Sequence, residues 1–384
     1  MKPYIAGSVA TMTTAVIFLA AAPHFALGEV QRIKLAPGPA GMETSQMGLG
    51  ALHFAELTQS GGAAALKDLL NVALQNKITL LDLADIYAYN ASAELVGQAF
   101  ALQPGLREKF QIVYKTGIVF PDAPVQYLDN GAEYMMHAVD IALTQLGTTY
   151  LDVLMPHAPD PLLDATELAM TFKKLKASGK VRYFGVSNFP PSKLALLQAA
   201  MEKQQMSLTT AELEISVLTP TALFDGRLDQ LQELGIAALA WGPLGGDPMA
   251  GANRLFNFPE GARQGRILAA LKDVASQMGP AVTPDQVAIA WLLRHPTRIV
   301  PVIGTVRADR LKAQAAATNL KMTRAQWTQI MGASAVANFK RWEQLNDGQW
   351  HDVANDSPNT FGSPLGVDVP VGFCDFGSCK APMA

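Results

Sequence analysis

The sequence predicts an α/β fold, a single-domain (β/α)₈ barrel of the TIM type. Eight short apolar runs lie between about residue 45 and residue 340, and segments with helical patterns separate them. The chain has 384 residues, 49% of them hydrophobic, which is enough to bury a full-sized core. Barrels of this type fold as one unit of about 250 residues or more, so the length does not require a second domain.

The predicted strands are apolar along their whole length, without the alternation of polar and apolar residues that marks a half-exposed strand. Continuous apolarity is typical of strands buried on both faces, as in a parallel sheet covered by helices. In chain order the runs are residues 47–54, 78–85, 110–117, 150–157, 181–188, 209–216, 236–241 and 299–305.

Helix boundary signals lie between these runs. Asp164 precedes an amphipathic segment as a capping acid, and Gly179 ends that segment. Residues 283–286 read Thr-Pro-Asp-Gln, a capping box with proline at the first helical position, and residues 323–326 repeat the pattern as Thr-Arg-Ala-Gln. Strands that alternate with helices in this way predict a closed parallel barrel.

An open, doubly wound sheet is the alternative for alternating strands and helices. Such a sheet normally carries a G-x-G-x-x-G phosphate-binding turn after its first strand. The first run here offers only Gly48 and Gly50. The barrel is therefore favoured.

The two ends of the chain are expected to lie outside the barrel, which we assign to residues 29–342. Residues 1–28 carry one early lysine, an apolar centre and small residues near the end, the pattern of a signal peptide for export or, in a plastid-type leader, for an organelle. A membrane anchor is the competing interpretation, although the apolar centre is short for a span. Residues 343–384 are rich in Gly, Pro, Asp, Asn and Ser and predict an irregular tail.

Both cysteines, Cys374 and Cys379, lie in this tail. Behind an export signal they would form a small disulfide loop, and two free thiols are the alternative. The barrel region has no cysteine, which excludes thiol chemistry and a cysteine-based metal site there. With 30 basic and 33 acidic residues and no basic run, the chain is not expected to bind nucleic acid.

Three charged or polar residues stand where three successive strands should be apolar or end. Asp82 and Lys115 interrupt the second and third runs, and His157 ends the fourth. Their strands are neighbours in a barrel, and barrel active sites lie at the carboxyl ends of the strands. A lone buried charge is costly, so Asp82 and Lys115 are expected to pair.

Tyr87 follows Asp82 by five residues, so its hydroxyl can fold back over the barrel mouth toward Lys115. A cation beside a phenol lowers the pKa of the phenol below about 10, which makes tyrosine a usable general acid. The pair can also be purely structural, and Tyr89 is a rival for the role of Tyr87. Tyr114 adjoins Lys115 but should point to the opposite face of its strand.

These residues resemble the pattern of the aldo-keto reductase family over about residues 30 to 335. The family's Asp and Tyr five residues apart match Asp82 and Tyr87, its Lys matches Lys115, and its His matches His157. The segment Gly-Val-Ser-Asn-Phe at 185–189 resembles the motif whose Ser and Asn, here Ser187 and Asn188, hold the nicotinamide carboxamide. Residues 30–37 and 239–246 further resemble a bacterial oxidoreductase subgroup of the family.

The resemblance implies an NAD(P)H-dependent reductase that converts small aldehydes or ketones to alcohols. Hydride would come from the nicotinamide and the proton from Tyr87, while Lys115 and Asp82 tune the phenol and His157 positions the carbonyl. Histidine rather than glutamate at that position favours carbonyl reduction over reduction of a carbon–carbon double bond. The other positions that the resemblance assigns to the cofactor are Glu212, Trp241 for stacking, Leu244 beside it, and Thr305 and Arg310 for the adenosine phosphate.

Two departures from the family pattern concern the cofactor. Glu212 stands where the family usually has glutamine, and an ionised glutamate cannot donate a hydrogen bond to the carboxamide oxygen. Val306 stands at the usual basic position next to Thr305, which leaves Arg310 as the bidentate phosphate partner. The sequence therefore favours NADPH, with NADH as the alternative.

Two other functions remain open on the sequence alone. A barrel that binds nicotinamide as a regulatory subunit, without catalysis, would also carry these motifs, and the departure at Glu212 agrees with it. A barrel hydrolase would use Asp82 and Glu94 as paired carboxylates, but Glu94 lies in a helical pattern. The apolar loops near 118–131 and 245–262 suggest a hydrophobic aldehyde or ketone as the substrate.

Overall fold

The computed structural model describes residues 30–119, 127–245, 255–256, 263–334, 342–344 and 350–352. The predicted leader, residues 1–28, lies outside this part of the chain. So do Cys374 and Cys379 and most of the two loops expected to choose the substrate. Among the described residues, no helix is both long enough and apolar enough to cross a membrane.

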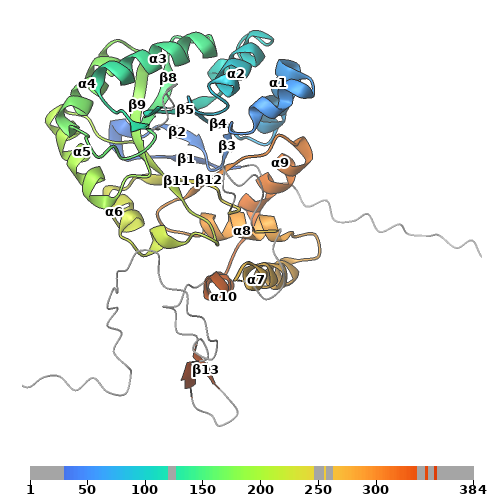
Figure 1. Ribbon diagram of the computed structural model, residues 1–384. Helices are drawn as coiled ribbons and strands as arrows, with labels where there is room; N and C mark the ends of the chain where they lie inside the picture. Colours follow the sequence, from blue (N-terminus) through green and yellow to red (C-terminus); the bar gives the residue numbers. More distant parts are fainter. Residues whose placement is uncertain are drawn as a thin grey trace, which may run out of the picture. The chain divides into compact units, whose positions relative to one another are not determined.

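Eight parallel strands close into a barrel, as the sequence predicts (Figure 1). Each strand lies within one of the eight apolar runs and pairs with its neighbours in the chain, and the last strand pairs with the first. The strands are β3 (Gly48–Gly50), β4 (Leu80–Ala84), β5 (Gln111–Thr116), β8 (Leu151–Pro156), β9 (Val181–Ser187), β10 (Thr210–Glu214), β11 (Ala237–Trp241) and β12 (Val300–Ile303).

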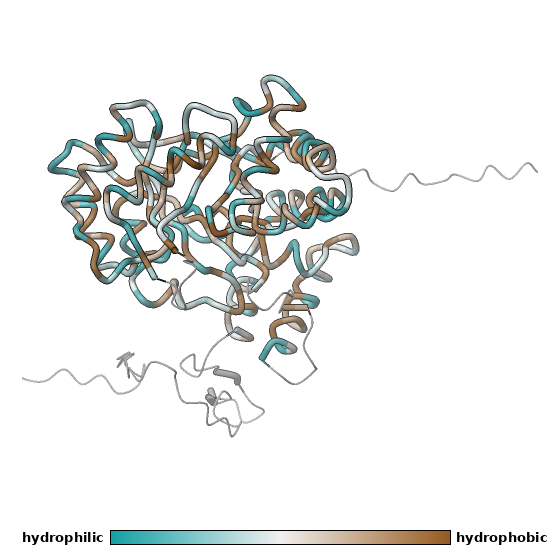
Figure 2. Tube along the Cα trace, turned by 45° about the horizontal axis from the view of Figure 1, so that its top comes forward, coloured by the Kyte–Doolittle hydropathy of each residue, from teal (hydrophilic) through white to brown (hydrophobic). Residues whose placement is uncertain are grey.

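Ten α-helices accompany these strands in the described residues, and Figure 2 shows hydrophobic and hydrophilic positions alternating around them. They are α1 (Gly62–Gln75), α2 (Ala91–Ala101), α3 (Ala132–Leu146), α4 (Ala165–Ala177), α5 (Pro191–Lys203), α6 (Arg227–Leu234), α7 (Arg263–Met278), α8 (Pro284–Leu293), α9 (Ala308–Ala315) and α10 (Arg324–Ser334). Short 3₁₀ segments are η1 (Gly38–Ala40), η2 (Phe54–Gln59), η3 (Arg107–Lys109), η4 (Thr221–Leu223) and η5 (Ala316–Asn319).

The predicted helix caps are present. The Asp164 carboxylate accepts hydrogen bonds from the backbone N–H groups of Thr166 at 2.8 Å and Glu167 at 3.1 Å. Thr283 and Gln286 form the capping box at the start of α8. These caps satisfy donors that the first turn of a helix otherwise leaves unpaired.

The barrel has two apolar cores, and alternation along each strand decides which core a residue joins. The smaller core fills the barrel interior and contains Leu80, Val113, Val153, Leu239 and Val300. The larger one lies between the strands and the helices. By the same alternation Asp82, Lys115, His157, Glu212 and Trp241 also face inward. Asp82 and Glu212 lie in the middle of their strands, and the other three lie at or just after the carboxyl ends.

The amino end of the barrel is closed by a hairpin of β1 (Arg32–Lys34) and β2 (Glu43–Ser45). Leu35 and Met42, in the loop of this hairpin, belong to the interior core.

A buried ion cluster lies near the same end, around Asp152 of β8. Its carboxylate accepts from Arg107 Nη2 at 2.9 Å, from the backbone N–H of Ile112 at 3.0 Å and from Arg182 Nη1 at 3.3 Å. The Tyr150 ring lies against both guanidinium groups, 4.2 Å from that of Arg107 and 3.6 Å from that of Arg182. These contacts tie the start of β8 to the segments that precede β5 and open β9.

The compact unit that contains the barrel ends at Ser334, and residues 335–384 belong to a second unit. At the start of the predicted tail, β13 (Trp342–Gln344) pairs antiparallel with β14 (Trp350–Asp352). Strands of three residues each leave no clear pattern in the sequence, and this hairpin was not predicted. Another two-stranded hairpin, β6 (Ile118–Val119) and β7 (Tyr127–Leu128), follows β5.

Candidate active site

A buried lysine at the carboxyl end of β5 is the centre of the site. The Lys115 ammonium lies 2.5 Å from Oδ1 of Asp82 on β4, so the predicted pair is present. It also lies 2.7 Å from Oε1 of Glu212 on β10. All three side chains are buried, which makes these contacts strong in an environment with little water.

Tyr87 covers this ion cluster. Its hydroxyl donates to Asp82 Oδ2 at 3.4 Å, and the Lys115 ammonium lies 5.4 Å from the centre of its ring. The His157 ring meets the Tyr87 ring edge to face, with 6.2 Å between the ring centres and 82° between the planes. The four side chains, predicted from three successive strands, therefore share one site. Tyr89, the rival tyrosine, is 80% exposed.

A left-handed turn follows Tyr87 and fixes its direction. Ala88, Tyr89 and Asn90 have φ angles of 50°, 52° and 69°, a conformation that residues other than glycine rarely adopt. The Tyr114 hydroxyl donates to Asn90 Oδ1 at 3.1 Å and so holds the end of the turn. Tyr114 thus faces away from Lys115, as alternation predicts, and supports the site from the helix side. The sequence gives no glycine signal for such a turn, and the sequence analysis missed it.

The electrostatics of the cluster correct one prediction. Burial raises the pKa of Tyr87 above its usual value, the carboxylate of Asp82 raises it further, and Lys115 lowers it by less. The expected decrease in the pKa of Tyr87 below about 10 is therefore wrong, because burial and the two carboxyl groups outweigh the one cation. The phenol keeps its proton at every physiological pH, which a proton donor requires.

The other two groups have defined charges. Burial lowers the pKa of Lys115, but the charges of Asp82 and Glu212 outweigh burial and hold it well above its usual value. Burial, and then the charge of Lys115, hold the pKa of His157 well below its usual value. Lys115 is therefore an ammonium, and His157 is a neutral imidazole that can donate a hydrogen bond.

Glu212 has a different partner from the one that the sequence predicts. Its side chain, expected at the nicotinamide carboxamide, bonds Lys115 instead, and Oε2 has no hydrogen-bond donor among the described residues. Burial, and then the charge of Asp82, raise the pKa of Glu212 to about 8. A buried acid at an inward-facing strand position needs a hydrogen-bond donor or a cation as a partner. The position of Glu212 in its strand was therefore a sequence signal for such a contact.

Ser187, Asn188 and Trp241 form a second connected group beside the first. Asn188 Nδ2 donates to Ser187 Oγ at 3.1 Å and to the carbonyl oxygen of His157 at 3.3 Å. The Trp241 indole N–H donates to Asn188 Oδ1 at 2.9 Å, which fixes the plane of the indole. These bonds join the carboxyl ends of β8, β9 and β11.

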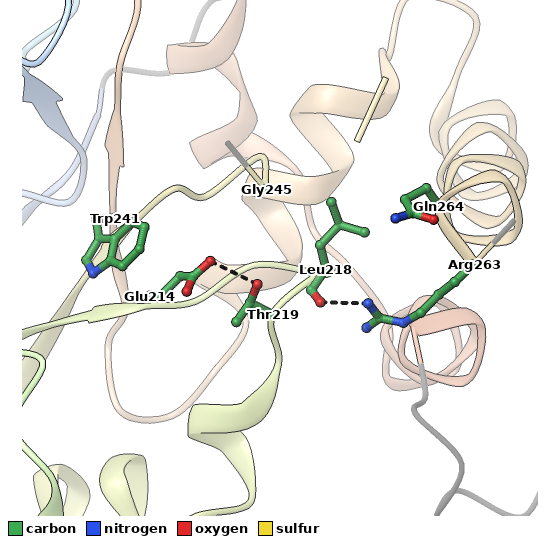
Figure 3. A pocket seen from close by; sticks show the side chains of 7 residues that line it. All are labelled: Glu214, Leu218, Thr219, Trp241, Gly245, Arg263 and Gln264. Carbon is green, nitrogen blue, oxygen red and sulfur yellow. Dashed lines mark hydrogen bonds between the residues drawn. The ribbon is translucent and has the colours of Figure 1, made fainter. Parts of the chain in front are cut away.

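A cavity of about 380 Å³ opens at one face of Trp241 (Figure 3). Its other lining residues come mainly from the segments after β10 and β11 and from the start of α7: Glu214, Leu218, Thr219, Gly245, Arg263 and Gln264. Arg263 donates to the Leu218 carbonyl oxygen at 2.9 Å, and Thr219 donates to Glu214 at 3.0 Å. The lining thus combines one aromatic ring with two charged and two neutral polar side chains.

The remaining predicted cofactor residues have other surroundings. Leu244 packs against the larger core. Thr305 lies between β12 and α9, where its hydroxyl accepts from the backbone N–H of Arg307 at 3.2 Å. Arg310 is exposed in the first turn of α9. Glu94 is exposed on α2, so the paired carboxylates of the hydrolase alternative are absent.

The sequence profile of the aldo/keto reductase family matches residues 46–335, most of the chain. The chain belongs to this family. Among curated aldo/keto reductase relatives, a 6-dehydroglucose reductase from Agrobacterium fabrum is 39% identical over 266 residues, which cover 68% of this chain and 84% of the relative. The oxidoreductase YdhF from Escherichia coli is 38% identical over 312 residues, which cover 79% and 98%.

A solved structure agrees with the fold. The thermostable aldo-keto reductase Tm1743, in complex with the inhibitor epalrestat, aligns with a TM-score of 0.64 and 24% identity over 79% of this chain and 99% of its own. The aldo/keto reductase described here is thus an oxidoreductase that reduces carbonyl groups with a nicotinamide cofactor. The comparisons give no support to the alternative of a subunit without catalysis.

Proposed function

We propose that Tyr87 is the proton donor of this reductase and that Lys115, Asp82 and His157 support it. The observation that carries the proposal is the contact of one buried ammonium with Asp82, directly beneath the Tyr87 ring. When the phenol gives its proton to the carbonyl oxygen, a phenolate forms, and the adjacent ammonium stabilises it. The neutral His157 imidazole donates a hydrogen bond to the same oxygen and orients the carbonyl.

The residues at the barrel mouth fit a nicotinamide. The Trp241 indole is held in one plane by Asn188 and borders the cavity, so a flat ring can stack on it. Buried His157 Nδ1 has no hydrogen-bond partner among the described residues, so a polar group of a ligand can satisfy it. A reduced nicotinamide, when bound, supplies the hydride. We assign Ser187, Asn188, Trp241 and Leu244 to its binding.

For the cofactor itself we propose NADPH. Thr305 and Arg310 both follow β12 in the chain, and an arginine fork and a hydroxyl can bind a phosphate. Arg307 is held by Asp309, with 2.6 Å between Nη2 and Oδ2, and is less available. Arg310→Ala should raise the Kd of NADPH about tenfold or more, the value of a charge-assisted hydrogen bond, and leave that of NADH unchanged. Quenching of tryptophan fluorescence measures both, and tighter binding of NADH by the unaltered protein would contradict the proposal.

The role of Tyr87 is tested by steady-state reduction of 4-nitrobenzaldehyde with NADPH. Tyr87→Phe should lower kcat by about 10²–10⁴-fold, the usual contribution of a general acid, and leave cofactor binding unchanged. Tyr89→Phe, which changes an exposed phenol, is the matched control. Equal turnover by Tyr87→Phe and the unaltered enzyme would disprove the assignment.

The substrate is proposed to be a hydrophobic aldehyde or ketone, on the apolar character of the two loops noted above. A panel of aldehydes, ketones and quinones with NADPH tests this, and a preference for polar sugars would contradict it.

For residues 1–28 we propose a cleaved signal that exports the protein or directs it to an organelle, with a membrane anchor as the alternative. Fractionation with N-terminal sequencing distinguishes the two, and intact Met1 in a soluble cytosolic fraction would contradict both.

A further inference from the structure

Glu212 is the buried ionisable group that the reaction above does not use. It is 1% exposed, and in the pairing of β10 with β9 it lies opposite Ser187, at the level of the active site. One of its oxygens contacts Lys115 at 2.7 Å, and the other has no donor in the described part of the barrel. An ionised carboxylate with an unpaired, buried oxygen is costly.

The charges around Glu212 do not balance if every acid is ionised. Asp82 faces Glu212 from β4, and Lys115 faces it from β5. The neutral phenol of Tyr87 faces it from the turn after β4. On β9 the charged residue is Arg182, which bonds Asp152 near the amino end of the strands, and β11 has no charged residue. Two carboxyl groups thus share one ammonium, and like charges in such a site hold one proton between them.

The contacts show which acid holds that proton. Asp82 receives both the ammonium at 2.5 Å and the Tyr87 hydroxyl at 3.4 Å, and both donors favour its ionised form. Glu212 receives the ammonium alone. A hydrogen bond from Glu212 to Asp82 also contributes to the raised pKa of Glu212, which is about 8. When Glu212 is neutral, Oε2 carries a proton that it can donate. This oxygen is then no longer a buried acceptor without a donor.

We propose that Glu212 is a positioning residue that works as a neutral carboxylic acid, holding Lys115 and donating to Asp82, and that its ionisation slows proton donation by Tyr87. The proposal rests on Tyr87 as the proton donor. While Glu212 is neutral, the cluster of Asp82, Lys115 and Glu212 has no net charge, and the phenolate that forms on Tyr87 adds one negative charge. Once Glu212 is ionised, the phenolate must form beside a cluster that is already negative, which is less favourable.

The test is the pH dependence of kcat for carbonyl reduction between about pH 5.5 and 10, in the unaltered enzyme, Glu212→Gln and Glu212→Ala. Glutamine keeps the size and both hydrogen-bonding functions of the neutral acid but has no ionisation. The unaltered enzyme should lose activity with a midpoint near the pKa of Glu212, about 8, and Glu212→Gln should show no decrease with that midpoint. Glu212→Ala should lower kcat at every pH, and by more than Glu212→Gln does, because nothing replaces the contact with Lys115. Glu233→Gln, a change to an exposed acid of α6, is the control and should leave the profile as it is.

An infrared difference spectrum between pH 6.5 and 9.5, recorded on the protein without cofactor, gives a readout that does not depend on turnover. The unaltered protein should lose a carboxylic-acid C=O band as the pH rises, and Glu212→Gln should lack that band. An alkaline decrease that persists in Glu212→Gln, or the absence of the band in the unaltered protein, would overturn the proposal. If Tyr87→Phe is inactive and these results are still negative, only the role of Glu212 fails; full activity of Tyr87→Phe would instead refute the proton donor.

Discussion

Replacement of Lys115 by methionine tests the whole cluster, because it removes the one cation and keeps most of the side-chain volume. The ammonium is 1% exposed and lies 2.5 Å from Asp82 and 2.7 Å from Glu212, so its loss leaves two acids facing each other in a buried site. Breaking a buried ion pair by removing one partner costs about 3–5 kcal/mol in the free energy of unfolding. For a unit of roughly 300 residues, that is about 5–8 °C in Tm.

The cost should depend on pH in a defined direction. Lys115 lowers the pKa of Glu212, so its removal raises that pKa in the folded protein further above the unfolded value. A group whose folded pKa is raised contributes stability at low pH and loses it as the pH rises. Tm of Lys115→Met should therefore fall more steeply than that of the unaltered protein between pH 5 and 8.

The same change should also slow the reaction. Without the ammonium the phenolate of Tyr87 loses its stabilising charge, and kcat should fall by about 10²-fold or more, or about 2.7 kcal/mol in the barrier. Differential scanning fluorimetry across pH and steady-state kinetics measure the two effects, with Lys174→Met, a change to an exposed lysine of α4, as the control. An unchanged Tm together with normal turnover would refute the assignment of a buried, charge-paired lysine to this site.

Three further predictions concern the stability of the folded protein. Asp152→Ala should lower the free energy of unfolding by about 3 kcal/mol, since it leaves a buried guanidinium unpaired, and an unchanged urea midpoint would contradict this. Asn90→Ala should destabilise the protein by about 1–2 kcal/mol through a strained φ and a lost bond to Tyr114, whereas Asn90→Gly should cost less; equal values would show that backbone strain is unimportant there. Glu212→Gln should remove one contribution to the pH dependence of stability. Because the folded pKa of Glu212 is raised to about 8, this group stabilises the fold fully below about pH 4.5 and progressively less up to about pH 8. Plots of Tm against pH that stay parallel for the two proteins over this range would contradict the prediction.

The fold and the centre of the site could be predicted because the sequence contains a direct signal for each: continuous apolar runs for the strands, and charged residues within them for the site. Few folds can bury both faces of eight strands, and the closed parallel barrel is one of them. A buried Asp82 and a buried Lys115 must form an ion pair if their strands are neighbours. Local spacing also placed Tyr87 above them. The closed barrel and the 2.5 Å contact confirm these predictions.

What could not be predicted depends on burial and on contacts across the barrel. The direction of the pKa shift of Tyr87 follows from how much water reaches the phenol, which no spacing of residues reports. Alternation shows that Glu212 faces inward, but it does not show which residue of the rim it meets. The left-handed turn after Tyr87 carries no glycine, because tertiary contacts such as the bond from Tyr114 to Asn90 maintain it.

The buried ion cluster around Asp152 has a consequence for engineering. It fastens three neighbouring segments near the amino end of the strands, at the opposite end from the loops that carry the reaction. Loops at the end of the barrel that carries the active site can thus be lengthened, shortened or exchanged without breaking the hydrogen bonds of Asp152. A library that randomises those loops should yield a large share of soluble, folded members, and the scaffold is suited to directed evolution toward new carbonyl compounds.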